Sequence, residues 1–179
     1  MKFQFILFFS TFFLFMNNSL SQSIHSFTVE DINGEIFEFK NLKGKKIMIV
    51  NTASKCGLTP QYKELEELYK KYLGEDFVIV GFPANNFLKQ EPGNNQEIAL
   101  FCSSTYGVSF PMMAKISVKG KDMHPIYKFL TNKELNGITN NSVKWNFQKY
   151  LLDKNGELFK VISPQKSPFD EEIIQWIEN

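Results

Sequence analysis

The sequence VNTASKCGLTP, residues 50–60, joins a short apolar run to the beginning of an amphipathic pattern. The preceding run, Ile47–Val50, is rich in β-branched residues and is typical of a buried strand. Thr is a favoured N-cap and Pro a favoured first helical residue, so Thr59 and Pro60 predict the start of a helix. Cys56 is therefore expected on a strand-to-helix turn, immediately before a helix N-terminus.

This position favours the thiolate form of Cys56. A helix N-terminus carries about half a positive charge, and Lys55 stands next to the cysteine. Because the thiolate is the nucleophilic form of cysteine, Cys56 is a candidate nucleophile. The alternative is that Cys56 is a small buried apolar residue, as free cysteines commonly are.

The patterns on either side predict a sheet with helices around it. Phe27–Val29 and Ile36–Phe39 indicate an N-terminal β-hairpin with an Asn-Gly turn. The other expected elements are strands over Phe77–Phe82 and Ile116–Val118, helices over Pro60–Tyr72, Gln96–Thr105, Pro125–Leu130 and Pro168–Ile177, and a hairpin of Trp145–Leu152 with Glu157–Ile162. An early β-α-β unit and a late hairpin predict an α/β, thioredoxin-like fold: a mixed central sheet flanked by helices. We expect its first two long helices on opposite sides of the sheet.

The first residues have the pattern of an export signal. The stretch MKFQFILFFSTFFLFMNNSLS contains an apolar segment, Phe3–Met16, followed by the small residues Ser19 and Ser21. This pattern predicts a signal peptide over residues 1–21, one domain over residues 22–179, and a secreted or periplasmic protein. A protein anchored in a membrane by an uncleaved leader is the alternative.

Charge and cysteine content exclude several classes of function. The 20 basic residues are all lysines and are nearly balanced by 19 acidic ones, which indicates no nucleic-acid partner. Without arginine, tight binding of a small polyanion is disfavoured. Cys56 and Cys102 form no CxxC pair, so a dithiol site is excluded, and with two histidines they give no zinc-binding spacing.

Three stretches resemble, in order, the signatures of the glutathione peroxidase family: VNTASKCGLTPQYKELEELY, GFPANNFLKQEPGNNQEI and VKWNFQKYLLDKNGE. The resemblance covers about residues 24–178 and implies a peroxidase of the oxidative stress response. It places Cys56 at the peroxidatic cysteine, which is selenocysteine in some members, and Gln90, Trp145 and Asn146 in a catalytic tetrad. Amide and indole donors can hydrogen-bond a thiolate and a departing oxygen without titrating.

Residue type alone would give these three side chains ordinary roles. Gln90 would be a solvated loop residue, Trp145 a core residue and Asn146 a cap or turn residue. Only the resemblance assigns them to a site.

The stretch ALFCSSTYGVSFPM places Cys102 where the thioredoxin-dependent branch of that family carries its resolving cysteine. The resemblance therefore implies an intramolecular disulfide with Cys56, recycled by a thioredoxin-like reductant without a bound cofactor. A structural core thiol is the alternative. The short loop Asn132–Asn141 is similar to the monomeric, phospholipid-hydroperoxide-like branch, whose open site admits hydrogen peroxide and organic or lipid hydroperoxides. A second hypothesis is a peroxide-sensing redox relay that passes its disulfide to a partner protein.

Two residues depart from the family pattern. Ala84 stands where the family commonly has Cys, which leaves Cys102 as the only internal partner for Cys56. Leu88 replaces a Gly, so we expect an unusual backbone angle at this position.

Overall fold

The computed structural model describes residues 22–179, and the expected leader lies outside the described residues. Within this range, no helix is both long enough and apolar enough to cross a bilayer. The elements, in chain order, are η1 (Ile24–Ser26), β1 (Thr28–Glu30), β2 (Ile36–Glu38), η2 (Phe39–Leu42), β3 (Lys46–Thr52), α1 (Gln61–Lys71), β4 (Phe77–Pro83), α2 (Asn95–Tyr106), α3 (Pro125–Thr131), α4 (Lys133–Asn136), β5 (Lys149–Leu152), β6 (Leu158–Ile162) and α5 (Glu171–Glu178).

The central sheet is mixed, as predicted. Its strand order is β4-β3-β5-β6, with β3 parallel to β4 and β5 antiparallel to both β3 and β6. The expected N-terminal hairpin forms a separate antiparallel pair, β1 and β2. Gly34 in its turn has a φ of +86°, a value that glycine adopts readily.

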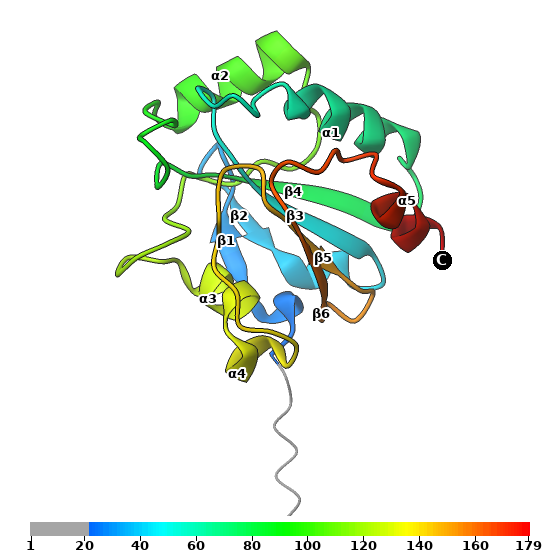
Figure 1. The fold of residues 1–179 in the computed structure, drawn as a ribbon. Helices are drawn as coiled ribbons and strands as arrows, with labels where there is room; N and C mark the ends of the chain where they lie inside the picture. The colour runs from blue at the N-terminus through cyan, green and yellow to red at the C-terminus, as the bar shows by residue number, and fades with distance from the viewer. Residues whose placement is uncertain (1–21) are drawn as a thin grey trace, which may run out of the picture.

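The sheet separates two apolar cores, which explains why the run Ile47–Val50 within β3 is apolar without interruption. Ile47 and Ile49 face a core shared with the β1–β2 hairpin and α3. Met48 and Val50 face the other core, which is shared with α1, α2 and α5. A strand buried on both faces has no polar alternation. Figure 1 shows α1 and α2 above the sheet and α3 and α4 below it.

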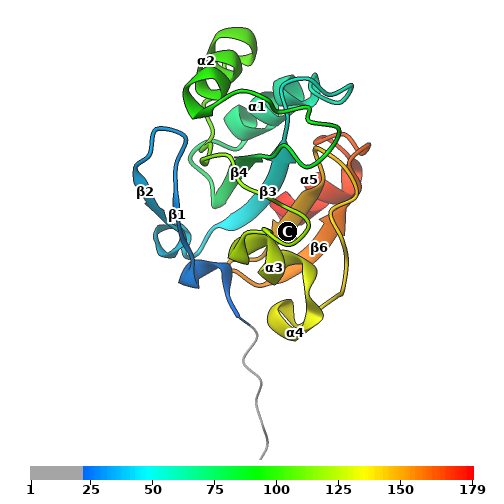
Figure 2. The same ribbon diagram turned by 90° about the vertical axis from the view of Figure 1, so that its left-hand side faces the viewer.

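The expectation that the first two long helices lie on opposite sides of the sheet is wrong. α1 and α2 lie side by side in both views (Figures 1 and 2), and the rings of Tyr62 and Tyr106 are 5.5 Å apart between their centroids. The reason is topological. β4 is an edge strand, and no further parallel strand follows α2, so nothing requires α2 to cross to the other face.

The expected strand Ile116–Val118 is also absent. The Ile116 N–H donates to Pro83 O at 3.0 Å, and the Val118 N–H donates to the side chain of Asn86 at 2.8 Å. Only isolated bridges form just upstream of this segment. The apolar alternation therefore packs against the core without a regular ladder, because its N–H groups donate to the last residue of β4 and to a side chain.

The loop expected over Asn132–Asn141 contains a short helix, α4, whose N-cap is Asn132.

Other differences lie at the ends of elements. α5 begins after the N-cap Asp170 rather than at Pro168. β5 begins at Lys149 rather than at Trp145, because Phe147 has a φ of +67° and interrupts the strand. The turn that results carries two of the expected site residues.

Candidate active site

Cys56 lies on the turn between β3 and α1, as predicted, and its side chain is buried. The Leu58 N–H donates to Cys56 Sγ at 3.4 Å. An N–H directed at the sulfur stabilises the thiolate more than the neutral thiol, because a hydrogen bond to a charged acceptor is the stronger one. The thiol is free.

Thr59 has a different role from the one expected. α1 begins at Gln61, and Pro60, not Thr59, occupies the N-cap position. The Thr59 hydroxyl instead accepts from the Cys56 N–H at 2.9 Å and donates to Ala53 O at 2.8 Å. It therefore closes the turn on which Cys56 lies, in place of capping the helix.

The loop that carries Gln90 lies against this turn. The Lys55 N–H donates to Gln90 O at 2.9 Å, and the Asn146 side chain donates to Gln90 Oε1 at 2.9 Å. Asn146 is fully buried. The structure therefore brings Gln90 and Asn146 into direct contact and ties both to the residue before Cys56.

Trp145 precedes Asn146 on the turn into β5. Its carbonyl accepts from Asn51 Nδ2 at 3.0 Å, and its ring packs against Phe87 with centroids 5.3 Å apart. Within residues 22–179, no hydrogen bond joins Cys56 Sγ to Gln90, Trp145 or Asn146. The four expected site residues thus lie on three segments that meet at the end of β3.

The backbone of the Gln90 loop is unusual where the sequence departs from the family pattern. Leu88 and Lys89 have φ values of +49° and +54°, so the expectation for Leu88 is confirmed. The bend directs the Gln90 N–H to Phe87 O at 3.1 Å. Leu88 is 77% exposed, so it keeps this strained conformation without a packing role.

Sequence reasoning missed Glu91, which follows Gln90. Its carboxyl group is fully buried, and Oε2 accepts from Ser54 Oγ at 3.1 Å. Burial raises the pKa of this carboxyl group. The side chain borders a pocket of about 560 Å³ that Lys55, Ile98 and Phe101 also line. The only signal in the sequence was its place in the second motif.

Cys102 lies on α2, is 3% exposed and is a free thiol. Burial raises its pKa to about 11; the nearby carboxylate of Glu91 acts in the same direction and the adjacent Tyr62 hydroxyl against it. At neutral pH this thiol is therefore almost wholly protonated. Both cysteines belong to the core beneath α1 and α2.

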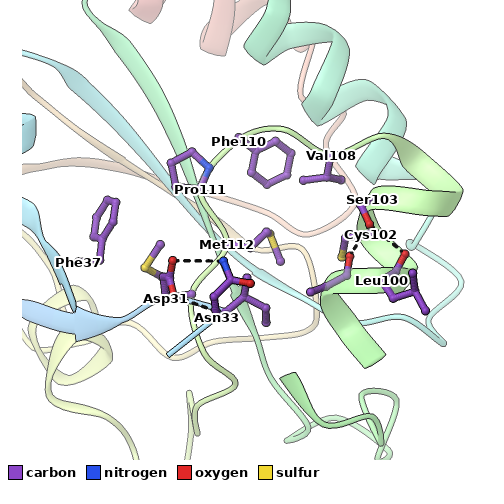
Figure 3. Close-up of a pocket in the computed structure, with 13 residues that line it drawn as sticks. Asp31, Asn33, Phe37, Leu100, Cys102, Ser103, Val108, Phe110, Pro111 and Met112 are labelled. Carbon is purple, nitrogen blue, oxygen red and sulfur yellow. Dashed lines mark hydrogen bonds between the residues drawn. The ribbon is translucent and has the colours of Figure 1, made fainter. Parts of the chain in front are cut away.

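On its other side, Cys102 borders a pocket of about 670 Å³. Figure 3 shows this pocket between α2, which contributes Leu100, Cys102 and Ser103, and the β1–β2 turn, which contributes Asp31 and Asn33. In the part of the chain that the structure describes, no three His, Cys, Asp or Glu side chains are placed to hold a metal ion.

The architecture belongs to the thioredoxin class of folds. A thioredoxin family thiol:disulfide interchange protein from Chlorobium tepidum TLS superposes with a TM-score of 0.60, covering 89% of this chain and 97% of that one, at 19% identity. The crystal structure of Trgpx in its apo form gives a TM-score of 0.68 at 36% identity, covering 88% of this chain and 97% of the other.

The protein-family model described as glutathione peroxidase matches residues 24–131. A glutathione peroxidase homolog, BsaA, of Halalkalibacterium halodurans is 48% identical over 146 residues, covering 82% of this chain and 92% of the relative. Glutathione peroxidase-like peroxiredoxin 2 of Saccharomyces cerevisiae is 47% identical over 156 residues, covering 86% and 96%. The chain belongs to the glutathione peroxidase family. It is an oxidoreductase, a thiol-dependent peroxidase, whose family implies a hydroperoxide substrate and a thiol reductant.

Proposed function

We propose that Cys56 is the peroxidatic nucleophile and that Gln90, Trp145 and Asn146 assist it. The observation that carries this proposal is the position of Cys56 Sγ before α1, where it accepts the Leu58 N–H. The thiolate attacks one peroxide oxygen; an S–O bond forms, the O–O bond breaks, and the departing oxygen takes a proton and leaves as an alcohol or water. Cys56 is left as a sulfenic acid. The bond between Gln90 and Asn146 supports a pre-organised set of donors.

In the second step, Cys102 attacks the sulfenic sulfur of Cys56. An S–S bond forms, the S–O bond breaks, and the hydroxyl group leaves with the Cys102 proton as water. Burial raises the Cys102 pKa to about 11, and a thiol with a raised pKa is a poor nucleophile while it stays buried. The step therefore requires α2 to open locally. Of the residues on this helix, only Ile98 and Cys102 are fully buried, which supports a low cost of opening.

The pocket beside Glu91 suits organic and lipid hydroperoxides as well as hydrogen peroxide. Ile98 and Phe101 provide an apolar wall, and Lys55 provides a cation. A thioredoxin-like donor then reduces the disulfide by thiol exchange, and no bound cofactor takes part. We further propose that the protein acts as a monomer and is exported.

The test is a coupled peroxide assay that compares thioredoxin and glutathione as donors. Cys56→Ser abolishes peroxide consumption. Cys102→Ser keeps one rapid turnover of Cys56 but loses turnover driven by thioredoxin. Equal catalytic efficiency with both donors would argue against the proposal. A wild-type protein that is oxidised once and then stalls with every donor would instead favour the redox relay.

A further inference from the structure

Lys149 is a buried lysine without a counter-ion. Its side chain is fully buried in β5, and Nζ donates to Gln61 Oε1 at 2.6 Å, Pro164 O at 3.2 Å and Lys166 O at 2.6 Å. An ammonium group has three N–H donors, and here each one has a neutral oxygen acceptor. Lys149 forms no salt bridge with any residue from 22 to 179. A buried charge is usually paired with an opposite charge, so the burial of Lys149 without an acidic partner requires an explanation.

The hydrogen bonds of Lys149 lead to Cys56. Gln61 is the first residue of α1, and its Nε2 also donates to Pro164 O at 2.8 Å, so the two side chains share one acceptor. The Gln61 N–H donates to Leu58 O at 2.9 Å, and the Leu58 N–H donates to Cys56 Sγ at 3.4 Å. Lys149 therefore contacts the side chain of Gln61, and the Gln61 backbone in turn binds Leu58, the residue whose N–H contacts the sulfur.

We infer that Lys149 is a positioning residue for Cys56: its ammonium fixes the start of α1, keeps the Leu58 N–H on the sulfur, and adds positive charge near the helix N-terminus. The inference rests on the proposed role of Cys56. A cation at this end of a helix is unfavourable on its own, since the helix terminus is itself positive. The three hydrogen bonds of the Lys149 ammonium hold it there all the same.

The neighbouring charged groups do not form an ion pair with Lys149. Glu64 on α1 accepts from Ser167 Oγ at 2.8 Å and favours the protonated form of Lys149 without pairing with it. On the facing segment and α5, the Lys166 ammonium is bound to Asp170 and Glu172. Glu172 also pairs with Lys160 of β6.

Burial lowers the pKa of Lys149 to about 7. As pH rises through this value, the amine loses one of its three donors and its charge. The assistance to Cys56 is therefore full well below this pH and is lost as the pH rises through about 7. A role that Lys149 filled only by packing of its aliphatic stem would not depend on the protonation of the amine.

Lys149→Met tests the inference, because methionine fills a similar volume and a buried charge can be replaced by an apolar residue without unfolding. The readout is the rate at which iodoacetamide alkylates Cys56 in a Cys102→Ser background. At about pH 6 the Lys149→Met protein reacts about tenfold more slowly than its parent, and the two rates converge within about twofold near pH 9.5.

Lys46→Met is the matched control. Lys46 also donates to backbone carbonyls, of Trp176 at 2.6 Å and Ile177 at 3.1 Å, but at the opposite end of β3 from Cys56. This variant alkylates at the parent rate at every pH.

A rate ratio between Lys149→Met and parent that is near one, or that stays constant with pH, would overturn the inference. If Lys149→Met does not fold, Gln61→Leu removes the link while leaving the lysine, and the same pH-dependent loss is expected. The alkylation assay is independent of peroxide. A wild-type Cys56 that is alkylated as described but does not react with peroxide would therefore refute the proposed function and leave this inference intact.

Discussion

The opening of α2 can be tested by a substitution in its first turn, which lies on the same helix as Cys102 but does not include it. α2 begins with a capping box: Asn94 Oδ1 accepts the Glu97 N–H at 2.9 Å, and Glu97 Oε2 accepts the Asn94 N–H at 2.8 Å. Asn94→Ala removes the first of these hydrogen bonds, and the side chain is not part of either core. Loss of such a cap costs about 1 kcal/mol of helix stability.

This cost sets the size of the expected effect. About 1 kcal/mol raises the population of the open helix about fivefold, since 1.4 kcal/mol corresponds to a factor of ten. Burial raises the Cys102 pKa from 9.0 to about 11, so the closed state holds about 100-fold less thiolate than an open one. Reaction of Cys102 therefore proceeds through the open state. Asn94→Ala should speed both alkylation of Cys102 and disulfide formation about fivefold.

The assays separate this effect from general destabilisation. Cys102 alkylation is followed in a Cys56→Ser background, and disulfide formation by stopped-flow fluorescence after peroxide addition. Asp170→Ala is the control, because Asp170 caps α5 by accepting the Glu172 N–H at 3.2 Å. If Asp170→Ala speeds alkylation as much as Asn94→Ala does, or if Asn94→Ala changes nothing, opening of α2 is not the route.

Four further outcomes are expected. Gln90→Ala slows the oxidation of Cys56, measured by stopped flow, about 10²- to 10³-fold, because one pre-organised donor is lost. A change below about twofold would show that Gln90 does not assist the reaction and has only a structural role. Trp145→Phe, which removes the indole N–H but keeps an aromatic ring, slows the same step in the same direction, and an unchanged rate would exclude the indole as a donor. Leu88→Asn raises the urea-unfolding free energy by about 0.5 kcal/mol, since Asn tolerates a positive φ; no gain would show that the bend is unstrained. The Cys102 thiol has a raised folded-state pKa, so its contribution to stability is present below pH 9 and is lost as pH rises through about 11. Wild type should therefore lose about 3 kcal/mol relative to Cys102→Ala over that interval in urea titrations, and a constant difference would contradict the burial argument.

Local patterns were sufficient to predict most of the elements. The run Ile47–Val50 is buried on both faces of the sheet and so has no polar alternation, and the Asn-Gly turn has the predicted geometry at Gly34. The wrong predictions concern non-local structure. The strand expected at Ile116–Val118 does not form, because its N–H groups donate to the end of β4 and to the Asn86 side chain. An amino-acid pattern does not show which acceptor will be nearest.

The candidate site was predictable only in part, for a similar reason. The motif order assigned Gln90 and Asn146, and the structure adds that the two side chains bind one another. The role of Thr59 was mistaken, since a hydroxyl that can cap a helix can equally close the preceding turn. The buried charges of Glu91 and Lys149 were missed because residue type alone predicts both to be solvent-exposed.

The central claim is that Cys56 and Cys102 act as a pair within one chain. The most direct test is mass spectrometry of the wild-type protein after treatment with one equivalent of hydroperoxide, with free thiols blocked before digestion. If the two cysteines act as this pair, one cross-linked peptide pair joins Cys56 to Cys102 in the monomeric fraction and disappears on addition of reduced thioredoxin. Cys56 found only as a sulfinic acid or in intermolecular dimers, with Cys102 still a free thiol, would contradict this claim.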